Sequence, residues 1–165
     1  MLYIKNILSF TLILPLIGIL ILLFIPNSNK TLLRSVALNV SCLTFISSVG
    51  LWVFFNKSIG SFQFVEKFFW IPILNLNFPI GVDGISLFFI ILTTLLIPLC
   101  LLASWDTIQV DLKKYLISFL IMEFFLIGVF CVLDLLLFYI FFESVLIPMF
   151  LIIGVWGSRE RKIRA

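Results

Sequence analysis

The stretch YLISFLIMEFFLIGVFCVLDLLLFYIFFESVLIPMFLIIGVW, residues 115–156, decides the fold class of this chain. It consists of two apolar segments, each long enough to cross a bilayer, which meet at Leu133 and Asp134 with no room for a loop. Each segment carries one internal carboxylate, Glu123 in the first and Glu143 in the second. Placing a carboxylate near the middle of a membrane-spanning helix costs about 2.5 to 3.5 kcal/mol on insertion scales, so both acids are candidates for function.

The tight antiparallel hairpin that this stretch predicts places the two acids at one depth. Glu123 lies ten residues before Leu133 and Glu143 ten residues after it. At 1.5 Å per residue, both lie about 15 Å from the tip of the hairpin. The spacing leaves open whether they face each other. A carboxyl held away from water favours its neutral form and can take up and release a proton, whereas the alternative is that one acid only hydrogen-bonds a neighbouring helix.

Composition places the whole chain among polytopic membrane proteins. Of its residues 63% are hydrophobic and 12% are charged, and its mean hydropathy is +1.30, whereas soluble domains are about a quarter charged. The net charge is +3, but the 11 Lys and Arg are scattered between apolar runs. They therefore indicate membrane topology, and we expect no nucleic-acid partner.

Five spans are expected in a single transmembrane region, which makes the predicted fold class all-α integral membrane. Their ranges are about 7–25, 32–55, 84–103, 115–133 and 134–155. The polar side chains from Ser35 to Ser48 are expected to face neighbouring helices. Residues 56–83 are rich in Phe and are expected to form an interfacial loop with a short strand or hairpin, and residues 157–165 form a basic tail.

The distribution of basic residues predicts an orientation. One side of the membrane would collect three of them, Lys5, Lys57 and Lys67. The other side would collect eight, namely Lys30, Arg34, Lys113, Lys114, Arg159, Arg161, Lys162 and Arg164. The positive-inside rule then places the N-terminus outside and the C-terminus on the cytoplasmic or matrix side.

Two further acids lie where helices are expected to start. Asp83 precedes the third span and is expected to cap it as a structural residue. Asp134 begins the fifth span near the membrane interface, where a cap is the simpler interpretation and a part in proton transfer is the alternative.

The chain carries no motif for redox or hydrolytic chemistry of its own. It has no His, its three Cys (Cys42, Cys100 and Cys131) show no CxxC spacing, and no phosphate loop or dinucleotide fingerprint is present, so we expect no metal site and no cofactor in this chain. No Lys or Arg lies in the middle of a span. A carboxylate relay would therefore need a cationic partner from other helices or chains.

Three motifs carry a resemblance to a known family. GVDGISL at 81–87, DLLLFYIFFESVLIPM at 134–149 and GVWG at 154–157 closely resemble the NADH dehydrogenase subunit 4 family. These are antiporter-like, proton-translocating subunits in the membrane arm of NADH:ubiquinone oxidoreductase, respiratory complex I. The resemblance implies that Glu143 is the family's glutamate on the fifth helix, which works with a lysine on a later, broken helix. Asp134 also matches an acidic family position, whereas the role of Glu123 rests on its depth alone.

The resemblance also implies partners and a location. Family members are longer, so this chain would be the N-terminal portion of an incomplete antiporter-like fold, completed by a separate chain carrying the rest of subunit 4 unless it is a truncated product. The enzyme would be the multi-subunit complex, with NADH, FMN, iron–sulfur clusters and ubiquinone bound by other subunits. Independently of the resemblance, the bias toward Phe, Ile and Asn and the lack of His suggest an A+T-rich organellar genome. This composition favours the mitochondrial inner membrane over a bacterial plasma membrane. The alternatives are a structural membrane-arm fragment that conducts no protons and a subunit of a cation/proton antiporter.

Overall fold

Five long helices make up most of residues 6–71 and 76–157, the part of the chain that the computed structural model describes. They are α2 (Ile7–Phe24), α3 (Lys30–Phe54), α4 (Gly84–Ala103), α5 (Leu112–Cys131) and α6 (Leu135–Trp156). All five are long and apolar enough to cross a membrane. Each boundary lies within three residues of the expected one, and the all-α membrane class is confirmed.

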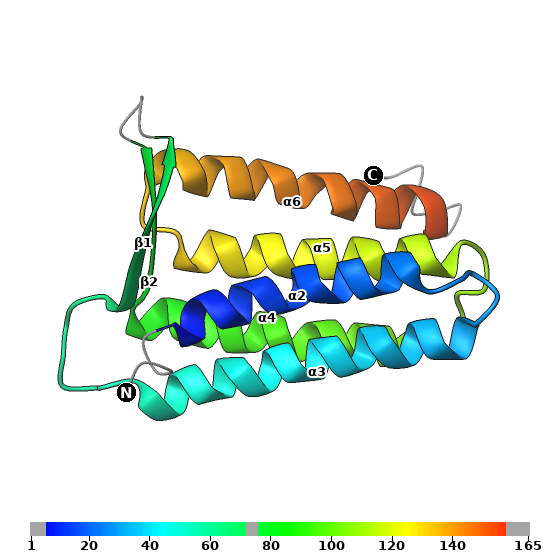
Figure 1. The fold of residues 1–165 in the computed structure, drawn as a ribbon, viewed down its shortest axis with the longest axis horizontal. Coiled ribbons are helices and arrows are strands. Elements are labelled where there is room, and N and C mark those ends of the chain that lie inside the picture. The colour runs from blue at the N-terminus through cyan, green and yellow to red at the C-terminus, as the bar shows by residue number, and fades with distance from the viewer. Residues whose placement is uncertain (1–5, 72–75, 158–165) are drawn as a thin grey trace.

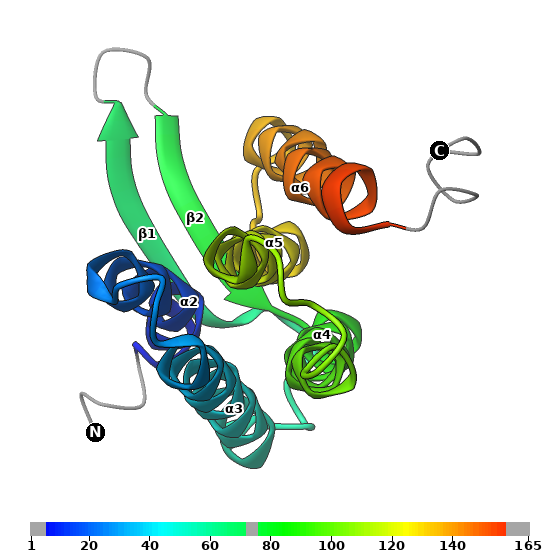
Figure 2. The same cartoon turned by 90° about the vertical axis from the view of Figure 1, so that its right-hand side faces the viewer.

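Each helix runs antiparallel to the next one along the chain, and α6 lies at the edge of the bundle (Figure 1). Helices α2, α3, α4 and α5 pack against one another, whereas α6 packs mainly on α5 at the edge of the bundle (Figures 1 and 2). In the most apolar 18-residue stretch of each helix, 17% is buried in α6 and 50% in α5. One long face of α6 is therefore left without a helical neighbour in the described chain.

The core of the bundle has two apolar clusters with polar side chains between them. The cluster near the start of α2 includes Leu8, Leu51 and Ile127, and the cluster near the other end includes Leu22, Leu33 and Leu116. The polar side chains at the middle of the bundle, all buried, are Thr11, Ser41, Thr44, Ser47, Ser48, Thr93, Thr94 and Glu123. The inward face predicted for α3 is thus present, except that Asn39 is exposed because it lies on the outer side of the helix.

A β-hairpin lies at the end of the bundle where α4 and α6 begin (Figure 1). It pairs β1 (Gln63–Ile71) with β2 (Leu76–Val82) in antiparallel register. The amide N of Leu133 donates to the carbonyl O of Pro79 at 3.0 Å, which fastens the α5–α6 connection to β2. The Glu66 carboxylate accepts hydrogen bonds from the backbone N and the Oγ of Ser9, in the first turn of α2. The hairpin therefore fixes the ends of three helices.

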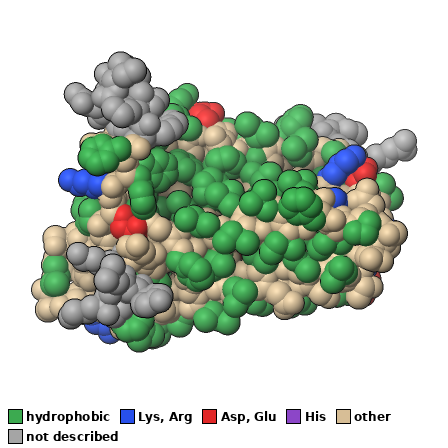
Figure 3. All heavy atoms as spheres, viewed as in Figure 1, with side chains coloured by type: hydrophobic (Ala, Val, Ile, Leu, Met, Phe, Trp, Pro, Cys, Tyr) green, Lys and Arg blue, Asp and Glu red, His purple; other side chains and the backbone are tan. Residues whose placement is uncertain are grey.

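Charged side chains gather at the two ends of the bundle, and hydrophobic side chains cover most of the length between them on the face shown in Figure 3. Lys57 and Lys67 follow α3 and lie in the hairpin region, whereas Lys30 starts α3 and Lys113 starts α5 at the opposite end. This separation matches the expected division of charge for the described residues. Lys5 and the basic residues from Arg159 onward lie outside them, and the orientation across the membrane stays a prediction.

Asp83 caps α4 through a reciprocal pair of hydrogen bonds. Its Oδ1 accepts from the backbone N of Ser86 at 2.7 Å, and its own backbone N donates to the Oγ of Ser86 at 3.0 Å. Hydrogen bonds from the side chain and the backbone of Ser86 lower the pKa of the Asp83 carboxyl. Asp83 thus has the geometry of the helix cap that the sequence predicts.

We expect Asp83→Ala to destabilise the protein by about 1 kcal/mol at neutral pH, because the first turn of α4 loses its cap. Asp83→Asn, which keeps an acceptor oxygen, should cost much less. Because folding lowers the pKa of Asp83, the carboxylate's contribution is present above its unfolded pKa and is lost as the pH falls through the folded one. Denaturant unfolding in detergent from pH 7 to pH 3 measures both effects, and equal stability of the wild-type and Ala proteins at pH 7 would contradict the cap.

Candidate functional site

The helical hairpin of α5 and α6 holds the two candidate acids. Close packing between the two helices determines how each is rotated about its own axis. A Cβ built on Gly128 would lie 2.5 Å from the Cδ1 of Phe141, so the two helices approach closely at this glycine. The rings of Phe124 and Phe125 also pack on Phe141, with centroid distances of 5.7 and 5.8 Å. These contacts determine which sides of α5 and α6 face each other, and the sequence spacing left this open.

Both acids lie at one depth along the hairpin. Glu123 lies eight residues before Cys131, where α5 ends, and Glu143 lies eight residues after Leu135, where α6 begins. At 1.5 Å per residue, each lies about 12 Å from its end of the hairpin. Both positions fall near the middle of helices of membrane-spanning length.

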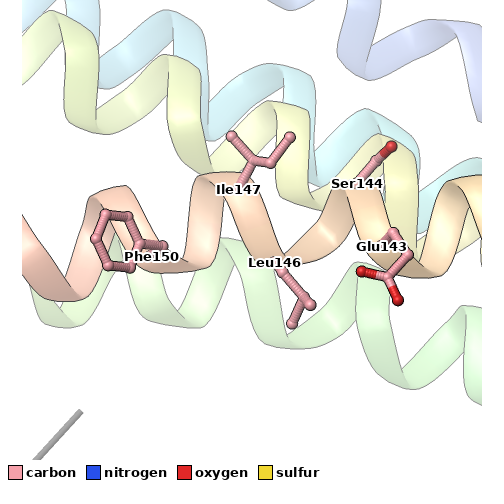
Figure 4. A pocket seen from close by; sticks show the side chains of 5 residues that line it. All are labelled: Glu143, Ser144, Leu146, Ile147 and Phe150. Atoms are coloured by element: carbon pink, nitrogen blue, oxygen red, sulfur yellow. The ribbon is translucent and has the colours of Figure 1, made fainter.

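Their surroundings are opposite. Glu123 is fully enclosed in the bundle, with 0% of its surface exposed, and neither of its carboxyl oxygens has a hydrogen-bond partner in the described chain. Glu143 is exposed on α6, where it lines an open hollow of about 460 Å³ with Ser144, Leu146, Ile147 and Phe150. Figure 4 shows Glu143 and Leu146 directed to one side of α6, and Ser144 and Ile147 to the other. The two carboxyls therefore do not share one buried site.

The polar side chains around the middle of the bundle bond mostly to one another and to their own helices. Ser48 Oγ lies 2.7 Å from Thr94 Oγ1, and Thr11 Oγ1 lies 2.6 Å from Ser47 Oγ. The hydroxyl of Thr44 donates to the carbonyl O of Val40, one turn earlier in α3. These bonds occupy the hydroxyl groups and leave the Glu123 carboxyl without a donor.

An ionised carboxylate in such a place would be costly. Burying an unpaired charge costs several kcal/mol more than burying a neutral polar group that lacks a partner. The described surroundings of Glu123 offer neither a donor nor an ion pair, so they suit a neutral carboxyl. The side chain can then hold a proton at the middle of the bundle until a polar or charged neighbour makes its release favourable.

The other two acids lie at helix starts, away from Glu123 and Glu143. Asp134 is the N-cap of α6, and its Oδ1 accepts from the backbone N of Leu136 at 3.2 Å. It precedes Glu143 by nine residues, about 13.5 Å along the helix. Asp83 lies at the same end of the bundle, at the start of α4. Glu123 and Glu143 thus lie at one level along the helices, whereas Asp83 and Asp134 lie at the end of the bundle that carries the β-hairpin.

Neither mid-bundle acid forms an ion pair within the described chain. The ion pair present there joins Lys114 to Asp111, near the start of α5. The three cysteines are free, with Cys131 buried and the other two exposed. In residues 6–71 and 76–157, no three His, Cys, Asp or Glu side chains are grouped closely enough to hold a metal ion.

Comparison with known proteins gives consistent similarities. The family model described as NADH:quinone oxidoreductase/Mrp antiporter, TM, matches residues 132–165, which include α6 and Glu143. The NADH-ubiquinone oxidoreductase chain 4 of Chondrus crispus is 63% identical over 160 residues, which are 97% of this chain and 32% of the relative. The chain 4 proteins of Arabidopsis thaliana and Marchantia polymorpha are 60% and 56% identical over 92% and 96% of this chain, and 30% and 32% of those relatives. The chain thus spans about a third of the length of the curated relatives it matches.

We expect Gly128→Ala to loosen the α5–α6 hairpin, because the added methyl group would force the Phe141 ring or the whole of α6 to move. Overpacking of this kind costs about 1 to 3 kcal/mol. Gly154→Ala is a matched control on α6, because a Cβ there meets no atom within 4 Å. Denaturant unfolding in detergent compares the two variants, and equal stability of the two would show that Gly128 does not set the packing of the hairpin.

Proposed function

This chain belongs to the NADH-ubiquinone oxidoreductase chain 4 family, and we propose that it forms part of a proton-translocating, antiporter-like subunit of respiratory complex I in which Glu143 carries protons. The observation that supports this role most directly is the position of Glu143. It is a carboxylate near the middle of a membrane-length helix, on a face that no described helix covers. Such a charge is costly in hydrocarbon and needs a partner or water.

The rest of a chain 4 subunit can supply that partner. Around Glu143, Ile147 and Phe150 are 65% and 75% exposed, so the face combines one acid with large apolar side chains. Relatives about three times as long provide chain enough to cover it. The family resemblance implies that one of their later helices brings a lysine to Glu143.

The mechanism is electrostatic. When the ammonium of the partner lysine approaches Glu143, it favours the ionised carboxylate and the proton leaves. When the ammonium moves away, the carboxylate in its apolar surroundings takes up a proton again. A conformational change that moves the lysine would thus couple distant quinone reduction to proton transfer, provided that it alters the interaction free energy of this pair.

Glu123 and Asp134 extend the path from Glu143 in two directions. Glu123 lies at the same depth on α5, is buried within the bundle and would hold a proton there. Asp134 caps α6 and is half-buried at the end of the bundle that carries the β-hairpin, where protons can exchange with water. In this proposal Glu123 relays protons laterally, and Asp134 serves the outer end of the path.

The proposal assigns the redox chemistry to other chains. NADH, FMN, the iron–sulfur clusters and ubiquinone would bind to other subunits, and the chain would lie in the mitochondrial inner membrane with its C-terminus on the matrix side. The name of the matching family model also includes Mrp antiporters, so a cation/proton antiporter subunit is the second candidate. Co-purification with flavin and iron–sulfur proteins supports the first candidate, and their absence from an intact, active complex supports the second.

We expect Glu143→Gln to reduce proton pumping per NADH oxidised at least several-fold in the assembled complex reconstituted in vesicles, because glutamine cannot carry the proton. Glu143→Asp keeps the carboxyl and should retain part of the activity. Ser144→Ala is a matched control, because Ser144 lines the same hollow and, among the described residues, its hydroxyl donates to the Ile140 carbonyl of its own helix. Unchanged pumping in an assembled Gln variant would leave Glu143 with a purely structural role.

We expect Glu123→Met to separate function from stability. Met has a similar volume, and the substitution removes a buried acid that has no hydrogen-bond partner in residues 6–71 and 76–157, so stability should stay equal or rise. Proton pumping should nevertheless fall, because the lateral relay is broken. The same vesicle assay, combined with thermal unfolding of the purified complex, measures both quantities, and full pumping by a stable Met variant would remove Glu123 from the path.

A further inference from the structure

A pocket of about 360 Å³ opens at the end of the bundle opposite the β-hairpin, where α2 ends and α3 and α5 begin (Figure 1). Three lysines line it, namely Lys30, Lys113 and Lys114. One acid, Asp111, also lines it, so the pocket has three positive charges against one negative charge. It is separate from the hollow beside Glu143 and takes no part in the proposed proton path.

The lysines are held in place but keep free donors. Lys30 Nζ donates to the carbonyl O of Gln109 at 3.0 Å, and Lys113 Nζ donates to the carbonyls of Leu23 and Ile25 at 2.9 and 3.0 Å. Since an ammonium has three donors, these bonds leave two on Lys30 and one on Lys113. Lys114 pairs with Asp111 at 3.1 Å, but both side chains are largely exposed, so this pair is weak.

The backbone adds to the positive potential of the pocket. Helices α3 and α5 both begin here, and the side chains of their N-cap residues, Asn29 and Asp111, make no capping hydrogen bond. The first-turn amides of both helices therefore keep their positive ends uncapped by side chains. The positive ends of both helix dipoles thus lie at this end of the bundle, where they favour an anion.

The lining continues from the basic rim onto apolar surface. Leu23 lies in the last turn of α2 and is 54% exposed. Ile117 also lines the pocket, five residues after the start of α5 and thus about 7.5 Å into that span. A free phosphate ion has no use for such a lining, whereas a phospholipid has acyl chains that lie at this level.

We propose that this pocket binds the phosphate of an anionic phospholipid, with the acyl chains along the exposed side of α2. Lysines at the boundary between spans and headgroups suit an anionic lipid, and each contributes about 1 kcal/mol to binding. The basic pocket lies at the end of the bundle that the charge distribution predicts to face the matrix. Inorganic phosphate shares the same chemistry, and the test distinguishes the two sources.

The test uses the assembled complex, purified in neutral detergent and supplied with photoreactive phosphatidylglycerol or photoreactive phosphatidylcholine. Peptide mapping reports labelling of residues 23–30 and 109–117. We expect phosphatidylglycerol to label these two segments more than phosphatidylcholine does, and the Lys30→Gln/Lys114→Gln variant to lower that labelling about thirtyfold. Lys113 is left unchanged because it holds the end of α2.

Two control variants make the result specific. Lys30→Arg/Lys114→Arg keeps both charges and should keep the labelling, and Lys57→Gln/Lys67→Gln removes two charges from the hairpin end and should not change it. If the double Gln variant fails to assemble, Lys114→Gln alone should still lower the labelling several-fold, because this side chain is exposed. Equal labelling by both lipids, or no effect of the Gln substitutions, would overturn the proposal. Loss of the phosphatidylglycerol labelling in millimolar phosphate, but not in chloride at equal ionic strength, would assign the pocket to free phosphate. That result would contradict the proposal of a lipid site.

Discussion

A carboxyl group at the level of the hydrocarbon must be neutral, paired or hydrated, and the arrangement of this chain depends on how its two mid-bundle acids meet that constraint. Glu123 is enclosed, and no described residue donates to either of its oxygens, which suits a neutral group. Glu143 lies at the same depth on the uncovered side of α6. One acid is thus enclosed within the described chain, and the other is exposed on its outer side.

The bundle is held firmly at its ends and is polar at its middle. At one end, the β-hairpin fixes α2 through Glu66 and Ser9, and fixes the α5–α6 connection through the bond from Leu133 to Pro79. At the other end, lysines that start α3 and α5 donate to carbonyls of neighbouring segments, as Lys30 does to Gln109. The buried hydroxyl groups and Glu123 lie between two apolar clusters, away from both sets of ties. This construction places the Glu123 carboxyl where the scaffold on either side is well anchored.

The sequence was sufficient to predict the spans and the depth of the acids, because both follow from the length of apolar runs and the rise per residue. It could not predict the rotation of α5 against α6, since both helices are apolar on almost every side and the deciding contact is Gly128 on the Phe141 ring. The cap that Glu66 provides for α2 joins residues 57 positions apart, and no local pattern announces such a contact. Asp83, by contrast, was predictable as a cap because its partner, Ser86, lies three residues away.

The interpretation depends most on what covers α6 in the assembled subunit. The most direct measurement is a high-resolution structure of the intact complex with the side chain of Glu143 resolved. We expect a lysine ammonium from a helix outside this chain to lie within about 4 to 6 Å of the carboxylate, or one water molecule away from it. Lipid acyl chains packed against Glu143, with no basic group and no water file in reach, would contradict the proposed proton path.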